Sequence, residues 1–134
     1  MNGKTLIIGL LAAALPALAQ DVDLSKLPPA AAKTGVTYAA DIKPIFEKSC
    51  VKCHSGEKAK AKLHLDTLEG ALKGNKDGKV IAPGNSTKSP LMISVAWLGD
   101  EEEWMPPKNN KANIARLSAE QVGLIRAWID QGAK

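Results

Sequence analysis

The sequence predicts an all-α fold in one small domain. Apolar side chains recur at helical spacing in several segments, and residues that favour helix starts or helix ends bound these segments. No segment shows the sustained alternation of apolar and polar residues that predicts a half-buried strand. A length of 134 residues suits a single domain behind an N-terminal targeting segment.

Residues 1–19 are predicted to be a signal peptide. Lys4 gives a positive start, residues 6–15 form an apolar run, and Ala17-Leu18-Ala19 is a small-x-small cleavage motif. The run is shorter than the roughly 20 apolar residues that a membrane-spanning helix needs. We therefore expect cleavage before Gln20 and export across the inner membrane to the periplasm. An uncleaved N-terminal anchor is the alternative.

Residues 20–37 are predicted to be an extended N-terminal lead-in. The segment contains Pro28-Pro29 and a run of alanines but no amphipathic period. We expect it to be a spacer outside the core. The folded domain is then expected to span residues 38–134.

The first predicted helix starts near Asp41, whose side chain can cap it. Ile42 and Phe46 recur at helical spacing, and Pro44 falls in the first turn, where a helix tolerates proline. The helix is expected to end near Cys50.

Two short helices are predicted in the middle of the chain. Asp66 and Glu69 form a capping pair for the first, which ends at Gly74. The second starts at Ser89-Pro90 and has one apolar face. That face contains Leu91, Met92, Val95 and Leu98.

The C-terminal helix has the clearest boundary signals. Ser118 and Gln121 form a capping box, and Leu117 can pack against Val122 as a hydrophobic staple. Gly132 follows as a helix end. The predicted buried stripe consists of Val122, Ile125, Trp128 and Ile129.

Two cysteines and a histidine give the strongest chemical signal, in the sequence Cys50-Val51-Lys52-Cys53-His54. Cys-x-x-Cys-His is the attachment motif of c-type haem. Each thiol can add to one vinyl group of the porphyrin, and one helical turn brings both sulfurs within reach of adjacent pyrroles. His54 is then carried beneath the iron as an axial ligand. We predict one covalently attached haem c, bound by Cys50, Cys53 and His54.

The motif has three other interpretations. A disulfide can join Cys50 and Cys53. Thioredoxin-like proteins use the same spacing but place it in a βαβ context, which the surrounding sequence lacks. A zinc site needs about four protein ligands, and His64 is the one further imidazole in the chain.

The second axial ligand is predicted to be Met105. It begins the sequence Met105-Pro106-Pro107, and the two prolines restrict the backbone, so less entropy is lost when the thioether binds iron. Met92 lies on the apolar face of a predicted helix, where methionine usually fills the core. His64 stands between two leucines and is expected to face solvent. A thioether ligand raises the reduction potential relative to a second histidine.

Residues 38–133 resemble small class I-like cytochromes c and, more narrowly, the cytochrome c domain of planctomycetes and verrucomicrobia. The matching motifs are, in order, Ile42-Lys43-Pro44-Ile45-Phe46, Cys50-Val51-Lys52-Cys53-His54, Leu63-His64-Leu65-Asp66, Pro83-Gly84-Asn85, Ser89-Pro90-Leu91, Met105-Pro106-Pro107-Lys108, and Leu117-Ser118 through Trp128-Ile129-Asp130-Gln131-Gly132-Ala133. The resemblance implies a cytochrome c-like helical domain wrapped around one covalently attached haem, with Met105 as distal ligand. The chain differs from the family by an acidic insertion before Trp104.

We expect an electron carrier rather than an enzyme, since the iron can cycle between its ferric and ferrous states while both axial ligands stay bound. Tyr38, Phe46 and Trp128, together with leucines, are expected to wall the haem. The alternatives are a cytochrome subunit of a periplasmic dehydrogenase complex and a haem-based ligand sensor. The sensor would require an open sixth position on the iron.

The charge distribution indicates which partners are plausible. The formal net charge is +4, and several lysines surround the haem motif while residues 100–103 are acidic. Lysines near a haem edge can steer an acidic redox protein, although a merely solvated face is the alternative. Export and scarce stacking aromatics, with one Phe, one Tyr and three Trp, argue against nucleic acid. We expect redox protein partners, no stable membrane insertion after cleavage, and a monomer.

Overall fold

The computed structural model describes residues 21–134, and the predicted signal peptide with its cleavage site lies outside the described residues. The described chain is a small helical domain, as predicted. Its one pairing of β type is an isolated bridge between Asn75 and Gly78, and residues 21–134 contain no strand. Within the same residues, no helix combines the length and apolar character that crossing a membrane requires.

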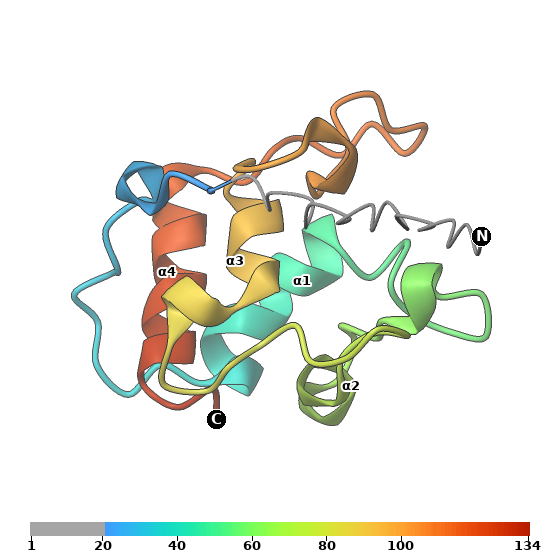
Figure 1. Ribbon diagram of the computed structural model, residues 1–134. Helices are drawn as coiled ribbons and strands as arrows, with labels where there is room; N and C mark the ends of the chain where they lie inside the picture. The colour runs from blue at the N-terminus through green and yellow to red at the C-terminus, as the bar shows by residue number, and fades with distance from the viewer. Residues whose placement is uncertain (1–20) are drawn as a thin grey trace, which may run out of the picture.

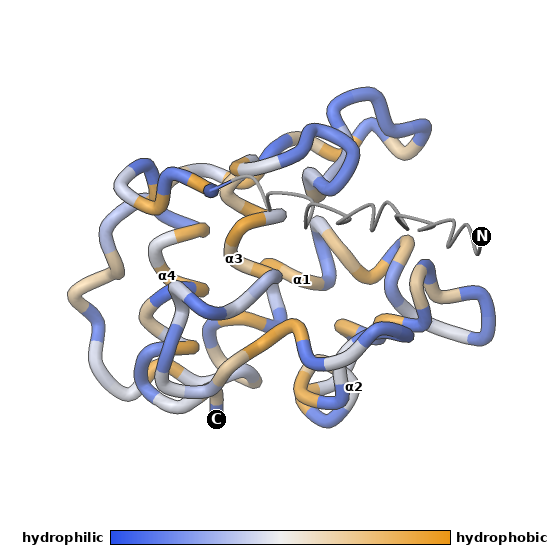
Figure 2. Tube along the Cα trace, in the orientation of Figure 1, coloured by the Kyte–Doolittle hydropathy of each residue, from blue (hydrophilic) through white to orange (hydrophobic). Residues whose placement is uncertain are grey.

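Three helical regions form the body of the domain (Figure 1). A π-helical turn, η2, spans Tyr38–Ile42 and continues directly into helix α1, Lys43–Ser49. Helix α3, Pro90–Val95, packs against the C-terminal helix α4, Ala119–Asp130, which also contacts η2. The short helix α2, Leu68–Lys73, lies at the lower edge of the view in Figure 1. Figure 2 shows that apolar residues concentrate in α1, α3 and α4, whereas the loop after residue 99 is largely hydrophilic.

An aromatic cluster joins these elements at the centre of the domain. The ring centroids of Tyr38, Phe46 and Trp128 lie 6.1 Å apart in each pair. The Tyr38 hydroxyl donates to the carbonyl of Leu65 at 2.9 Å, and the Trp128 indole donates to the carbonyl of Lys134 at 3.0 Å. Both polar groups are therefore satisfied inside an apolar core, which is what buried Tyr and Trp need.

The first helical segment starts earlier than predicted. The N-cap is Thr37, whose hydroxyl accepts the N–H of Ala40 at 3.3 Å. Asp41 lies inside the first turn, where its carboxylate accepts the N–H of Thr37 at 3.0 Å. The prediction that Asp41 is the N-cap is wrong because η2 adds a turn before α1, so Asp41 reaches back to the cap.

The start of α2 also differs from its prediction by one residue. Thr67, not Asp66, is the N-cap, and its hydroxyl accepts the N–H of Gly70 at 3.0 Å. Thr67 has an extended backbone, which directs its hydroxyl towards the first free amides of the helix. The helix ends at Gly74 as predicted. A Cβ there would lie 2.1 Å from the carbonyl oxygen of Gly78, so the close approach and the positive φ both require glycine.

Helix α3 starts as predicted and ends sooner. Ser89 is the N-cap and Pro90 the first helical residue. The helix ends at Val95, so Leu98 lies beyond it and is only partly buried against the core.

The boundary signals of α4 are confirmed. The Ser118 hydroxyl accepts the N–H of Gln121 at 3.1 Å, and the Gln121 side chain accepts the N–H of Ser118 at 2.9 Å. Leu117 and Val122 are both buried, and Gly132 follows the C-cap with φ +108°.

The predicted lead-in contains a short 3-10 helix, η1, at Leu24–Lys26, and the expectation that the segment lies outside the core is wrong. Leu27 and Val36 are 6% and 4% exposed and belong to the core cluster. Its backbone groups bond to α4 and the C-cap. The contacts are Arg126 Nη1 to the Pro28 carbonyl, the Ala31 N–H to the Gly123 carbonyl, Gln131 Nε2 to the Lys33 carbonyl and the Val36 N–H to Gln131 Oε1. An amphipathic period cannot reveal this packing, because the segment pairs through its backbone. The domain boundary at residue 38 stays a prediction.

Candidate functional site

A cavity of about 300 Å³ separates the Cys50–His54 motif from the loop that contains Met105. This volume falls at the lower end of the roughly 300–1,000 Å³ that cofactor and small-molecule sites occupy. Its walls are mainly aliphatic and come from Leu63, Leu65, Val80, Leu91, Val95 and Ile114. The cavity is therefore mainly apolar, with Glu102, Glu103, Asn75 and Asn110 as polar lining residues and with sulfur and nitrogen atoms from two separate chain segments.

The backbone places all three motif residues around this cavity. Helix α1 closes with the Cys50 N–H donating to the Phe46 carbonyl at 2.8 Å. The next turn returns the N–H groups of Cys53 and His54 to the Cys50 carbonyl, at 3.1 and 3.0 Å. Cys50, Cys53 and His54 consequently all line the cavity, as the spacing of the motif predicts.

The two thiols are free in this structure, so the motif does not form a disulfide. Burial, with a smaller contribution from Cys53, raises the pKa of Cys50 to about 12. Cys50 is therefore a neutral thiol at physiological pH. Residues 21–134 contain no cluster of three or more His, Cys, Asp or Glu side chains able to hold a metal. The thioredoxin alternative also lacks its βαβ context in these residues.

His54 is suited to bind iron. It is 5% exposed, and burial lowers its pKa, although the nearby backbone of Lys60 and Leu63 opposes this shift. The neutral imidazole is the form that ligates metals. Its Nδ1 atom is buried and has no hydrogen-bond partner in the described chain. Buried polar atoms are nearly always paired, so an unpaired imidazole nitrogen beside a cavity fits a ligand-binding role.

Of the candidates for the second axial position, the structure brings Met105 to the cavity. Met105 lines it, and the Met105 N–H donates to the carbonyl of Ser94 in α3 at 3.1 Å. Met92 is fully buried in the core and is not among the lining residues. The His64 side chain is 42% exposed, lies 4.0 Å from the Asp66 carboxylate, and does not line the cavity either.

The walls of the cavity differ from the expectation in one respect. Leu63, Leu65 and Leu91 line it, but Tyr38, Phe46 and Trp128 do not, because they pack on one another in the separate aromatic cluster. Ile114 and Asn110 line the cavity from the loop after Met105, and no sequence pattern predicts this position for them. Loop residues carry no periodicity, so their position depends on the tertiary structure.

Comparison with protein families agrees with this arrangement. Residues 50–109 match the family model described as Planctomycete cytochrome C. Residues 50–109 are a planctomycete cytochrome c domain. The cytochrome c match includes the attachment motif and the Met105-Pro106-Pro107 loop, hence both sides of the cavity. The wider resemblance, over residues 38–49 and 110–133, stays a prediction. Comparison with curated proteins and with solved structures finds no significant match.

Membership of residues 50–109 in this family implies a covalently attached haem c, and the chain has one Cys-x-x-Cys-His motif for it. The residues at the cavity fit that group. They supply two free thiols, a buried neutral imidazole with an unpaired nitrogen, a thioether and an aliphatic lining. Cytochrome c domains are typically electron carriers rather than enzymes.

Proposed function

We propose that this chain is an exported single-haem electron carrier and not an enzyme. Cys50 and Cys53 would hold the haem covalently, and His54 and Met105 would bind its iron. The observation that supports this most is the shared cavity, which the attachment motif and Met105 both line. When bound, the haem supplies one-electron exchange between its ferric and ferrous states.

The chain's own residues favour a raised reduction potential. Aliphatic side chains such as Leu65, Val80 and Val95 form most of the lining, and Glu102 and Glu103 line the cavity as well. A low dielectric disfavours the additional positive charge of the ferric form, and a thioether ligand acts in the same direction. His54 follows a hydrogen-bonded turn and the Met105 N–H is bonded to α3, so the backbone at both proposed ligands is held in place.

The proposed partners are redox proteins that approach the side of the attachment motif. Its exposed lysines are Lys48, Lys52, Lys58, Lys60 and Lys62. Charges of one sign around a redox site raise the association rate with an oppositely charged partner, and salt screens this effect over about 8–10 Å. In this proposal the protein is a periplasmic monomer that binds neither nucleic acid nor membrane. Reduction by an acidic redox protein should slow as salt is added. A rate independent of salt would contradict this role of the lysines.

The test is the absorption spectrum of the purified holo-protein in both redox states, together with Met105→Ala. We expect a covalent c-type spectrum and, in the ferric state, the weak charge-transfer band of sulfur-ligated haem. Met105→Ala should remove that band and lower the potential. Met92→Leu, which changes a methionine in the core, is the matched control and should keep the band.

Each contrary result has its own meaning. Covalent haem whose ferric band survives in Met105→Ala would show that another residue is the sixth ligand. A wild-type ferrous protein that binds carbon monoxide readily would support a ligand sensor. Co-purification with a larger catalytic subunit would support the dehydrogenase alternative, and a protein without covalent haem would overturn the proposal.

A further inference from the structure

We infer that two stacked tryptophans, Trp97 and Trp104, together with Arg116, set how firmly Met105 is held on the haem iron. The inference rests on the proposed function, because it assigns positioning residues to the proposed Met105 ligand. Trp97, Trp104 and Arg116 do not line the cavity, so they act through Met105 and not on the haem.

The two indole rings form a parallel stack next to the ligand. Their centroids lie 4.9 Å apart with an interplanar angle of 13°. Trp104 directly precedes Met105, and Trp97 follows the end of α3. Both indole N–H groups are buried without hydrogen-bond partners in the described chain, so contact between the rings, and not hydrogen bonding, holds the pair. The tryptophan stack thus closes the acidic loop that contains residues 98–103.

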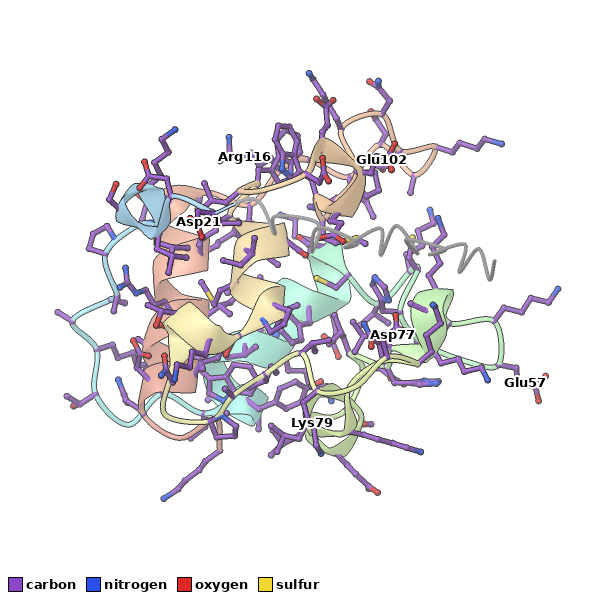
Figure 3. The ribbon with its side chains drawn as sticks, viewed as in Figure 1. Asp21, Glu57, Asp77, Lys79, Glu102 and Arg116 are labelled. Carbon is purple, nitrogen blue, oxygen red and sulfur yellow. The ribbon has the colours of Figure 1, made fainter. Side chains whose placement is uncertain are left out.

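Arg116 also contacts the stack. Its guanidinium carbon lies 4.9 Å from the centroid of the Trp97 ring, within the range of a cation–π interaction. Its Nη2 atom also donates to the Ala96 carbonyl at 3.0 Å. Figure 3 shows Arg116 on the same side of the molecule as Glu102, which lines the cavity. Arg116 therefore connects the end of α3 to the segment that leads into α4.

The backbone shows that this region is held in a defined position. Trp97 has φ +58°, a left-handed conformation that bulky residues rarely adopt. Such backbone persists only where surrounding contacts enforce it, and it is concentrated at functional sites. The Ser94 carbonyl accepts the N–H groups of both Trp97, at 3.2 Å, and Met105, at 3.1 Å. A shift of Trp97 is therefore transmitted to the backbone of Met105.

The test uses the ferric holo-protein and imidazole as a ligand that competes with Met105 for the iron. Trp104→Leu removes the stack and should increase the affinity for imidazole roughly fivefold to tenfold, the size expected for one aromatic pair. The charge-transfer band should weaken and the reduction potential should fall. Trp104→Phe retains an aromatic face and should restore values close to wild type.

Arg116→Gln is the second variant, because Arg116 is exposed and its replacement leaves the core intact. It should increase imidazole affinity about threefold. Arg126→Gln is the matched control, since Arg126 also donates to a backbone carbonyl, that of Pro28, at 2.8 Å, but binds the N-terminal segment. The control should leave imidazole affinity and potential unchanged.

The outcomes separate this inference from the proposed function. A wild-type protein without the sulfur band refutes the axial role of Met105. The second outcome is a wild-type protein that has the band, with Trp104→Leu and Arg116→Gln variants that bind imidazole no more tightly than the Arg126→Gln control. This outcome refutes the inference and leaves the axial role of Met105 intact. Should Trp104→Leu fail to fold, Arg116→Gln decides: a rise in imidazole affinity supports the inference and no change refutes it.

Discussion

The two sides of the cavity are built in different ways. On the histidine side, one continuous stretch of chain makes its own hydrogen bonds, from Phe46 through Cys50 to His54. On the methionine side, Met105 lies in a loop without regular helix. Its N–H donates to the Ser94 carbonyl, and the preceding residue, Trp104, stacks on Trp97. Local backbone bonding positions the first ligand and tertiary contact positions the second, so mutations should affect the two ligands separately.

The largest expected effect is on the histidine side. Replacing both Cys50 and Cys53 by alanine should abolish covalent haem, because no other cysteine is present in the chain. Intact mass measured under denaturing conditions checks this, with Met105→Ala as the variant that should retain the haem mass. Haem still covalently bound in the double variant would show that attachment does not depend on the motif.

The aromatic cluster tests whether the core can be weakened without disturbing the methionine. Phe46→Ala should lower the free energy of unfolding by about 3–5 kcal/mol, since Phe46 is fully buried against Tyr38 and Trp128. The ferric charge-transfer band should persist in the folded variant, because none of these rings lines the cavity. Guanidinium unfolding and the ferric spectrum are the measurements. Loss of the band without denaturant would mean that the two regions are coupled.

A smaller effect is expected from Asn110, which organises the chain after Met105. Its side chain donates to the carbonyls of Pro107 and Ile114 at 2.9 and 2.8 Å and accepts the Ile114 N–H at 2.8 Å. Asn110→Ala should destabilise this loop by about 1–3 kcal/mol, the cost of leaving such groups unpaired. Hydrogen exchange should accelerate at the Ile114 amide and stay unchanged in α1. Equal acceleration of hydrogen exchange in α1 and at Ile114 would show that the two sides of the cavity are not independent.

The smallest effect concerns the start of the segment that leads to the histidine side. Hydrogen bonds from the Lys33 side chain and the Thr37 backbone lower the pKa of Asp41 below its ordinary value of 3.8. The ionised carboxylate therefore stabilises the folded state above pH 3.8, and this contribution is lost as the pH falls through the lower folded pKa. Asp41→Asn should be less stable than wild type at pH 7, and thermal unfolding should show the difference shrinking in acid. A stability difference that does not depend on pH would show that the ionised Asp41 carboxylate does not stabilise the folded state.

Some predictions from the sequence succeeded because they depend on neighbouring residues. The capping box of α4, the proline at the start of α3 and the glycine that ends α2 are local signals, and the structure confirms all three. The two misplaced caps, Asp41 and Asp66, each have a competing threonine hydroxyl within one turn, Thr37 and Thr67. Sequence spacing alone cannot decide which side chain reaches a free amide.

The sequence by itself determined the helical class of the fold and the attachment motif, because one turn of backbone fixes Cys50, Cys53 and His54 relative to one another. It also singled out Met105, through its two prolines. Only the tertiary structure decided that Met105 shares a cavity with His54, that Leu27 and Val36 join the core, and that Trp97 meets Trp104. The first two sets of contacts join residues far apart along the chain, and the third joins two loop residues that no helical or strand period relates.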